Sequence, residues 1–254
     1  MRPDLVLLRE LIEASPVIAT RPGGGVAADR IAAAESAVGP LSVSYRWWLG
    51  AYGGGTLSGA APATVVPPGA AGAEEDITAG WRLDAGLLCF FTEPDGGDSY
   101  HFDLGRRTDG EHPVIRRDHF SGAEEQAADS FAGFLTGEVA LSNGLGLGPV
   151  PGLARLWRST PGVLLPNGVH VYGPHDLLER NETYGVADYA PDWLLIGDDS
   201  GGSGLFVRRH GEDRGTVHLL DLGAGERDIA GCGVSRPVTD DLLGWLGDGA
   251  PLHT

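Results

Sequence analysis

Carboxylate and imidazole groups are concentrated in one short stretch, at Asp95, Asp98, His101 and Asp103. Oxygen and nitrogen ligands of this kind can bind a divalent metal ion. The surrounding alternation of aromatic and polar residues, however, is typical of a strand, in which His101 and Asp103 would share one face. We therefore expect them to form the solvated face of a sheet and not a metal site.

Two further groups could in principle carry chemistry. Asp118 and His119 are adjacent, but neither a nucleophile nor a third catalytic member is identifiable by motif. An EF-hand loop that begins at Asp198 would need Gly at its sixth position and Glu at its twelfth. The sequence has Ser203 and Arg209 there, so a turn is the better interpretation. The sequence has no G-x-S-x-G, H-E-x-x-H or P-loop motif. We expect no catalytic residue, no metal and no cofactor.

The two cysteines, Cys89 and Cys232, lie far apart in the sequence and cannot by themselves supply a zinc cluster. Cys89 is part of the apolar run 87–91, which is typical of a buried strand. A buried, reduced thiol is the expected state of this residue.

The chain of 254 residues is strongly acidic, with 35 Asp and Glu against 18 basic residues and a net charge of −17. Nonspecific attraction to nucleic acid or to anionic membranes is disfavoured by this charge, so a macromolecular partner is expected to be a basic protein. High acidity is also common in proteins that merely need solubility. The longest N-terminal apolar run has four residues, which predicts neither a signal peptide nor a membrane span, and hence a cytoplasmic protein.

Helical spacing of apolar residues predicts helices over residues 4–14, 29–38 and 42–52 in the first half. In the third of these, Tyr45, Trp48 and Tyr52 lie on one stripe and are expected in the core, whereas Trp47 lies off it. Apolar runs on either side of a Gly-Gly turn predict a hairpin over residues 87–104. A strand at 113–115 and a closing helix at 130–135 are expected to follow.

The second half repeats part of this order. A shift of 105 places aligns residues 88–91 with 193–196 and the glycines 96–97 with 201–202, and a shift of 111 aligns 131–135 with 242–246. Residues 143–152 combine several Gly and Pro residues and form the best candidate linker. These observations predict an α+β protein of two related domains, 1–142 and 143–254. The second is expected to be shorter at its front, with only the segment 153–157 where the first has long helices.

This pattern resembles the SUKH superfamily, which includes the fungal cell-wall-assembly regulators and many bacterial immunity proteins. In the first half the resemblance is carried by Ala34-Glu35, Leu41, Tyr45, Trp48-Leu49, the glycines 53–55 and the hairpin just described. In the second half it is carried by Val186, the run 189–199 and the glycines 201–202. Ser42 replaces the proline that usually follows Leu41, and the second half lacks a clear Ala-Glu helix.

The resemblance implies two tandem domains, each with a central, mostly antiparallel sheet flanked by helices. It also implies a non-enzymatic immunity protein of a polymorphic toxin system, which binds a cytosol-acting nuclease or deaminase toxin. An interaction scaffold or regulator without a toxin is the alternative, and an uncharacterised hydrolase is a third. For partner binding we expect an aromatic anchor and acidic steering residues, namely Trp47, Glu74, Glu75, Asp76, Glu93, Asp95, Asp98, Asp198 and Asp199.

Overall fold

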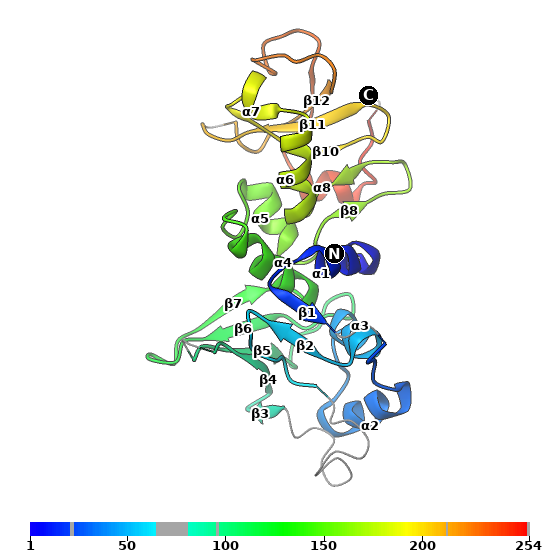
Figure 1. Cartoon of the computed structure of the whole chain (residues 1–254), viewed down its shortest axis with the longest axis vertical. Helices are drawn as coiled ribbons and strands as arrows, with labels where there is room; N and C mark the ends of the chain where they lie inside the picture. Colours follow the sequence, from blue (N-terminus) through cyan, green and yellow to red (C-terminus); the bar gives the residue numbers. More distant parts are fainter. Residues whose placement is uncertain (21–22, 65–80, 95–96, 212, 253–254) are drawn as a thin grey trace. The chain divides into compact units, whose positions relative to one another are not determined.

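The computed structural model describes residues 1–20, 23–64, 81–94, 97–211 and 213–252. The chain separates into two compact units, Met1–Leu135 and Thr136–Thr254. The division between them falls inside helix α4 (Phe131–Ser142). Eight helices and three antiparallel sheets are present in the described residues, which confirms the predicted α+β class with antiparallel sheets (Figure 1).

The first unit is built around a five-stranded antiparallel sheet in the order β3-β4-β5-β6-β7. Its strands are β3 (Arg82–Asp84), β4 (Leu87–Thr92), β5 (Ser99–Asp103), β6 (Val114–Arg117) and β7 (Glu124–Ala128). Each strand pairs with the next one along the chain. The predicted hairpin is therefore confirmed as β4–β5, and the strand expected at 113–115 is β6.

Helices precede this sheet at the positions that the apolar spacing predicted. They are α1 (Leu5–Ala14), α2 (Ala28–Val38) and α3 (Val43–Tyr52), and a two-stranded sheet is formed by β1 (Ile18–Thr20) and β2 (Gly55–Leu57). Asp4 caps α1 by accepting from the backbone N–H groups of Val6 and Leu7. After α3 the chain turns at Gly53, whose left-handed φ of 71° strongly favours glycine.

An aromatic core joins α3, the sheet and the first turn of α4. The Tyr45 ring lies 5.0 Å from that of Phe102 and 4.9 Å from that of Phe131, and Phe90 stacks on Phe102 at 4.2 Å. All four side chains are fully buried, and burying a Phe side chain contributes ~1.5–3 kcal/mol. Trp48 is also buried, so the predicted core stripe of α3 is confirmed.

A buried polar junction fixes the start of α3 against the turn before β6. Both Glu111 carboxylate oxygens accept bonds of 2.7 Å from Ser44, one from its backbone N–H and one from its hydroxyl. The Ser44 hydroxyl also accepts from the backbone N–H of Ala132 in α4, at 3.2 Å. Burial raises the pKa of Glu111, while the bonds from Ser44 act in the opposite direction.

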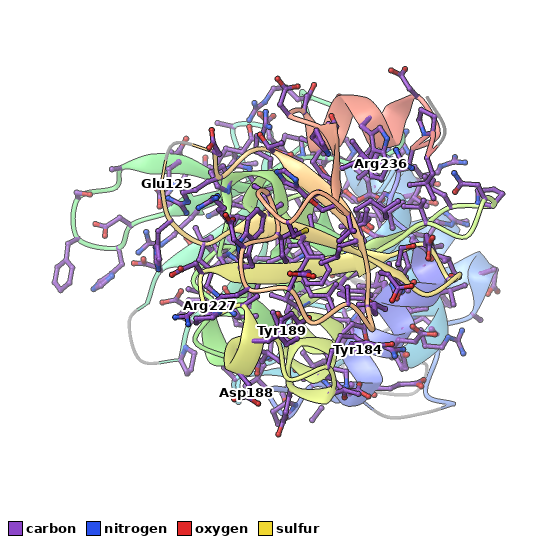
Figure 2. All side chains as sticks on the ribbon, turned by 90° about the horizontal axis from the view of Figure 1, so that it is seen from above. Glu125, Tyr184, Asp188, Tyr189, Arg227 and Arg236 are labelled. Carbon is purple, nitrogen blue, oxygen red and sulfur yellow. The ribbon has the colours of Figure 1, made fainter. Side chains whose placement is uncertain are left out.

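The second unit contains a six-stranded antiparallel sheet in the order β13-β12-β11-β10-β9-β8. The strands are β8 (Val163–Leu164), β9 (His170–Val171), β10 (Trp193–Asp198), β11 (Ser203–Arg208), β12 (Val217–Asp221) and β13 (Arg236–Thr239). Its helices are α5 (Pro151–Trp157), α6 (Pro174–Thr183), α7 (Val186–Tyr189) and α8 (Leu242–Gly247). Figure 2 shows Tyr184 at the end of α6 and Asp188 and Tyr189 on α7.

The hairpins β4–β5 and β10–β11 share a bulge on their first strand. In the first unit Phe90 is the extra residue between the paired positions Cys89 and Phe91. In the second unit Ile196 is the extra residue between the paired positions Leu195 and Gly197. A bulge adds one residue to one strand only and bends it, so its recurrence is a specific likeness between the two sheets.

A second shared bulge lies in the last strand pair. The extra residue is Ala127 on β7 in the first unit and Val238 on β13 in the second. These residues are 111 positions apart, as are the first residues of α4 and α8. The residues next to the bulges pair from strand to strand across each sheet. The paired residues are Cys89–His101–Ile115–Gln126 in the first sheet and Leu195–Phe206–His218–Pro237 in the second.

Two expectations from the sequence need correction. His101 was expected on a solvated face, but it is buried, and the charged side chains of Arg82, Asp84, Arg117 and Glu124, which come from other strands, interact with it. The guanidinium of Arg117 on β6 reaches Asp84 on β3 at 3.4 Å, and this contact spans the two strands between them. The second half was expected to have only a short helix at its front, whereas α6 and α7 precede its main hairpin.

Candidate functional site

The turn between β6 and β7, residues 118–123, is held in shape by Asp118. One carboxylate oxygen of Asp118 accepts from the backbone N–H of Phe120 at 3.1 Å and from the N–H and hydroxyl of Ser121, both at 2.7 Å. The bonds from Ser121 are the main reason that the pKa of Asp118 is lowered. Backbone bonds link Asp118 to Ala123 and Gly122 at 2.9 Å each. The turn is therefore closed by side-chain and backbone bonds together.

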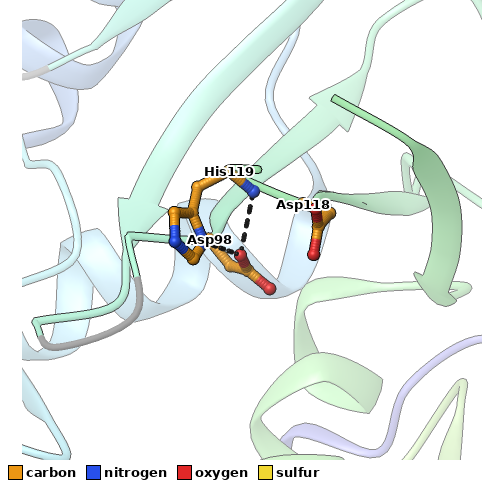
Figure 3. A group of neighbouring side chains, drawn as sticks. All are labelled: Asp98, Asp118 and His119. Atoms are coloured by element: carbon orange, nitrogen blue, oxygen red, sulfur yellow. Dashed lines mark hydrogen bonds and ion pairs between the residues drawn. The ribbon is translucent and has the colours of Figure 1, made fainter. Parts of the chain in front are cut away.

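Asp98, the residue before β5, anchors the same turn from the neighbouring hairpin. Its Oδ1 accepts from the backbone N–H of His119 at 3.0 Å and lies 2.8 Å from Nδ1 of that ring (Figure 3). Its Oδ2 lies 2.5 Å from the guanidinium of Arg116, and the side chain is 6% exposed. The bonds from His119 and then those from Arg116 lower the pKa of Asp98 to about 2. Asp98 is thus a charged structural anchor.

Asp98, Asp118 and His119 offer three ligand atoms within 4.8 Å of one another. The guanidinium of Arg116 already lies against Asp98, and a second cation at this place would be repelled by it. One oxygen of Asp118 is also used by the three donors of the turn. This arrangement favours an ion-paired turn over a metal centre.

A surface depression of about 280 Å³ adjoins the turn and is lined by Arg116, Asp118, Ser121, Ala123, Glu124 and Glu125. Arg116 and Arg117 form ion pairs of 2.8 Å with Glu125 and Glu124, respectively. Glu125 stands on the outer strand β7 (Figure 2). Phe120, at the middle of the turn, is 89% exposed, and its ring centroid lies 3.8 Å from that of His119.

Trp47, the expected aromatic anchor, is half-buried on α3. Its ring packs edge-on against Tyr52 at 5.7 Å, and the guanidinium of Arg9 lies 5.6 Å from its centroid. Both contacts are within the first unit. They use part of the ring surface that a partner would otherwise contact.

The structure ties several of the expected steering carboxylates into local contacts. Glu93 accepts a 2.7 Å bond from the Tyr100 hydroxyl. In the second unit Asp198 accepts from the Tyr172 hydroxyl and from the N–H of Ser200, and Asp199 from the N–H groups at positions 201 and 203. Glu74, Glu75, Asp76 and Asp95 lie outside the described residues. A role of these residues in binding stays a prediction.

Sequence reasoning did not single out Phe120 or Arg116. A signal for Phe120 existed, because a large apolar residue stands in the polar turn Asp118-His119-Phe120-Ser121-Gly122. No comparable signal existed for Arg116, whose role depends on pairing between strands that are distant in sequence.

The reduced thiol expected at Cys89 is present, since both Cys89 and Cys232 are free and Cys89 is buried. Among the described residues no helix is long and apolar enough to cross a membrane.

Comparison with known proteins gives one family match. The model of the SMI1/KNR4 family (SUKH-1) matches residues 25–137, which include α2, α3, the five-stranded sheet and the first turns of α4. The same model does not detect a second copy in the remainder of the chain. No curated protein matches the chain.

Proposed function

We propose that the chain is a non-enzymatic immunity protein that neutralises a basic toxin by direct binding, because the SUKH-1 family model matches residues 25–137. The family match carries the proposal, because immunity proteins form a large part of the SUKH superfamily. The net charge of −17 supports it, since an acidic surface speeds encounter with a basic partner. The ion-paired cluster at Asp98 is consistent with binding and does not resemble a hydrolytic centre.

A nuclease or deaminase toxin is the proposed class of partner. Such toxins bind nucleic acid through basic surfaces, which an acidic protein can cover in place of phosphates. The proposed site of action is the cytosol, where such a toxin would meet its substrate.

We also propose that the second unit is a diverged copy of the SUKH-1 domain. The support is the shared order of four antiparallel strands and a closing helix, with bulges at Phe90 and Ile196 and again at Ala127 and Val238. A crystal structure can test this. Superposing β4–β7 on β10–β13 should bring the first turn of α4 onto α8, and a mismatch of these helices would contradict duplication.

The functional proposal predicts a toxin gene next to the gene of this chain, and the toxin domain that it encodes is the partner to test. Cells that produce the toxin should survive when this chain is produced with it, and the purified proteins should form a stable complex. Absence of both protection and binding would contradict the immunity role and favour a scaffold or regulator. A toxin that is inactivated by turnover, with no stable complex, would instead indicate an enzyme.

A further inference from the structure

Phe120 is unusual in this molecule because it is a large apolar side chain with almost no cover. It is 89% exposed, more than any other large apolar residue in the described part of the chain. Its neighbours in the turn are polar, and the ring contact with His119 leaves most of its surface open to water. A single exposed apolar residue is ordinary on a protein surface, so the case for a contact site rests on the order of the turn and on the charge around it.

The turn that presents Phe120 is already ordered. Asp118 accepts from the backbone N–H of Phe120 itself and from Ser121, and Asp98 holds the backbone and ring of His119. Arg116 fixes Asp98 in turn through its ion pair. A side chain on an ordered turn loses little conformational entropy on binding, so more of its contact energy remains as affinity.

The surroundings of Phe120 are acidic. Asp98, Asp118, Glu124 and Glu125 supply four carboxylates at the turn or beside it, and two guanidinium groups, at 116 and 117, pair with three of them. Two negative charges are left over. Glu125 is 66% exposed, so its charge is available to a partner that approaches the depression beside the turn.

We propose that the β6–β7 turn is the principal contact surface of the first unit, and that Phe120 inserts into an apolar pocket of a protein partner whose rim carries Lys or Arg. Aromatic side chains in desolvated pockets supply much of the binding energy of protein interfaces. The acidic rim around Phe120 matches a basic rim in sign and favours fast association. The inference rests on the proposed function, since the partner is the toxin that the chain is proposed to neutralise.

The test uses the full chain and that toxin domain, inactivated by substitution of its catalytic residue. Phe120→Ala should raise the dissociation constant at least about 30-fold, mainly through faster dissociation. The variant should fold normally, because the ring is exposed. Val6→Ala, which shortens another apolar side chain, 66% exposed on α1, should change the constant less than about 3-fold.

A second variant tests the charge of the partner's rim. Glu125→Gln should slow association at low salt, and the rates of variant and wild type should converge near 1 M salt, where the Debye length is ~3 Å. Equal association rates of variant and wild type at low salt would contradict a basic rim on the partner.

The outcomes separate the two proposals. If the wild-type chain does not bind the toxin, the immunity role and this contact surface both fail. If the wild-type chain binds and Phe120→Ala binds equally well, only the contact surface is wrong. If Phe120→Ala instead abolishes self-association of the chain, measured by light scattering, the surface joins copies of this chain and the proposed partner is wrong.

Discussion

The carboxylate of Asp98 lies 2.5 Å from the guanidinium of Arg116, and this pair joins the end of the β4–β5 hairpin to the β6–β7 strand pair. Arg116 also pairs with Glu125 on the next strand at 2.8 Å. The pKa of Arg116 is raised by its bonds to Glu125 and Asp98, so it stays charged. Pairing of β6 with its neighbouring strands thus places the permanently charged guanidinium of Arg116 beside Asp98.

The ion pair should make stability depend on pH in the acidic range. The folded pKa of Asp98 is lowered to about 2, whereas an unfolded Asp titrates near ~3.9. Its contribution is therefore complete above about pH 5 and is lost as the pH falls through ~4 toward 2. Asp98→Asn should be less stable than wild type at neutral pH, and the gap in the free energy of unfolding should narrow between pH 4 and 2. The free energies of unfolding are measured by urea denaturation at each pH. A difference between the two proteins that stays constant from pH 4 to pH 2 would contradict this prediction.

Ser44 should be a stability determinant although it is a small polar residue. Ser44→Ala removes one donor to the buried carboxylate of Glu111 and one acceptor for the N–H of Ala132. Leaving buried polar groups unsatisfied costs ~1–3 kcal/mol. The matched control is Ser36→Ala on α2, where the hydroxyl is exposed and donates to Ala32 of its own helix, with an expected change within ~0.5 kcal/mol. Equal stabilities of the two variants in chemical denaturation would show that the junction is not a determinant.

The sequence predicted the core of the first unit well because its signal is local. Tyr45, Trp48 and Tyr52 follow one another at spacings of three and four residues. Such an apolar stripe is expected in the core whichever element packs against it. The β4–β5 hairpin was also predictable, since apolar runs flank a turn rich in Gly and Asp. In both cases the whole pattern lies within one short stretch of sequence.

Strand β7 was not predicted, because its strand conformation depends on residues of another strand. The segment Glu124–Ala128 consists of Glu, Gln and Ala, which favour helix over strand. It becomes an edge strand because Glu124 and Glu125 lie opposite Arg117 and Arg116 on β6. The sequence singled out Asp98 and the pair Asp118-His119 separately, but not Arg116 or Phe120, because these residues are brought together only when β5, β6 and β7 pair.

The Asp98–Asp118–His119 group should not function as a metal centre. Zn²⁺ or Mn²⁺ would have to displace Arg116 from Asp98 or lie beside its charge. Addition of either ion at 1 mM, an order-of-magnitude excess over the ~0.1 mM protein used in calorimetry, should therefore leave the Tm unchanged. Saturable binding by calorimetry that is lost in His119→Ala would overturn this expectation.

Association with the toxin should depend strongly on salt if acidic surface guides the encounter. The Debye length falls from ~10 Å at 0.1 M to ~3 Å at 1 M, so the association rate should fall across this range while dissociation changes less. Asp98, Asp198 and Asp199 are unsuitable for charge reversal, because each accepts structural hydrogen bonds.

The informative variant reverses Glu74, Glu75 and Asp76 together, and it should slow association. Trp47→Ala is the matched comparison, because loss of an anchor ring speeds dissociation and leaves the association rate nearly unchanged. This substitution also removes the contacts with Tyr52 and Arg9, so its Tm must be measured alongside its kinetics. An association rate that is independent of salt and unchanged by the triple reversal would show that shape and apolar contacts alone, such as those proposed for Phe120, determine recognition.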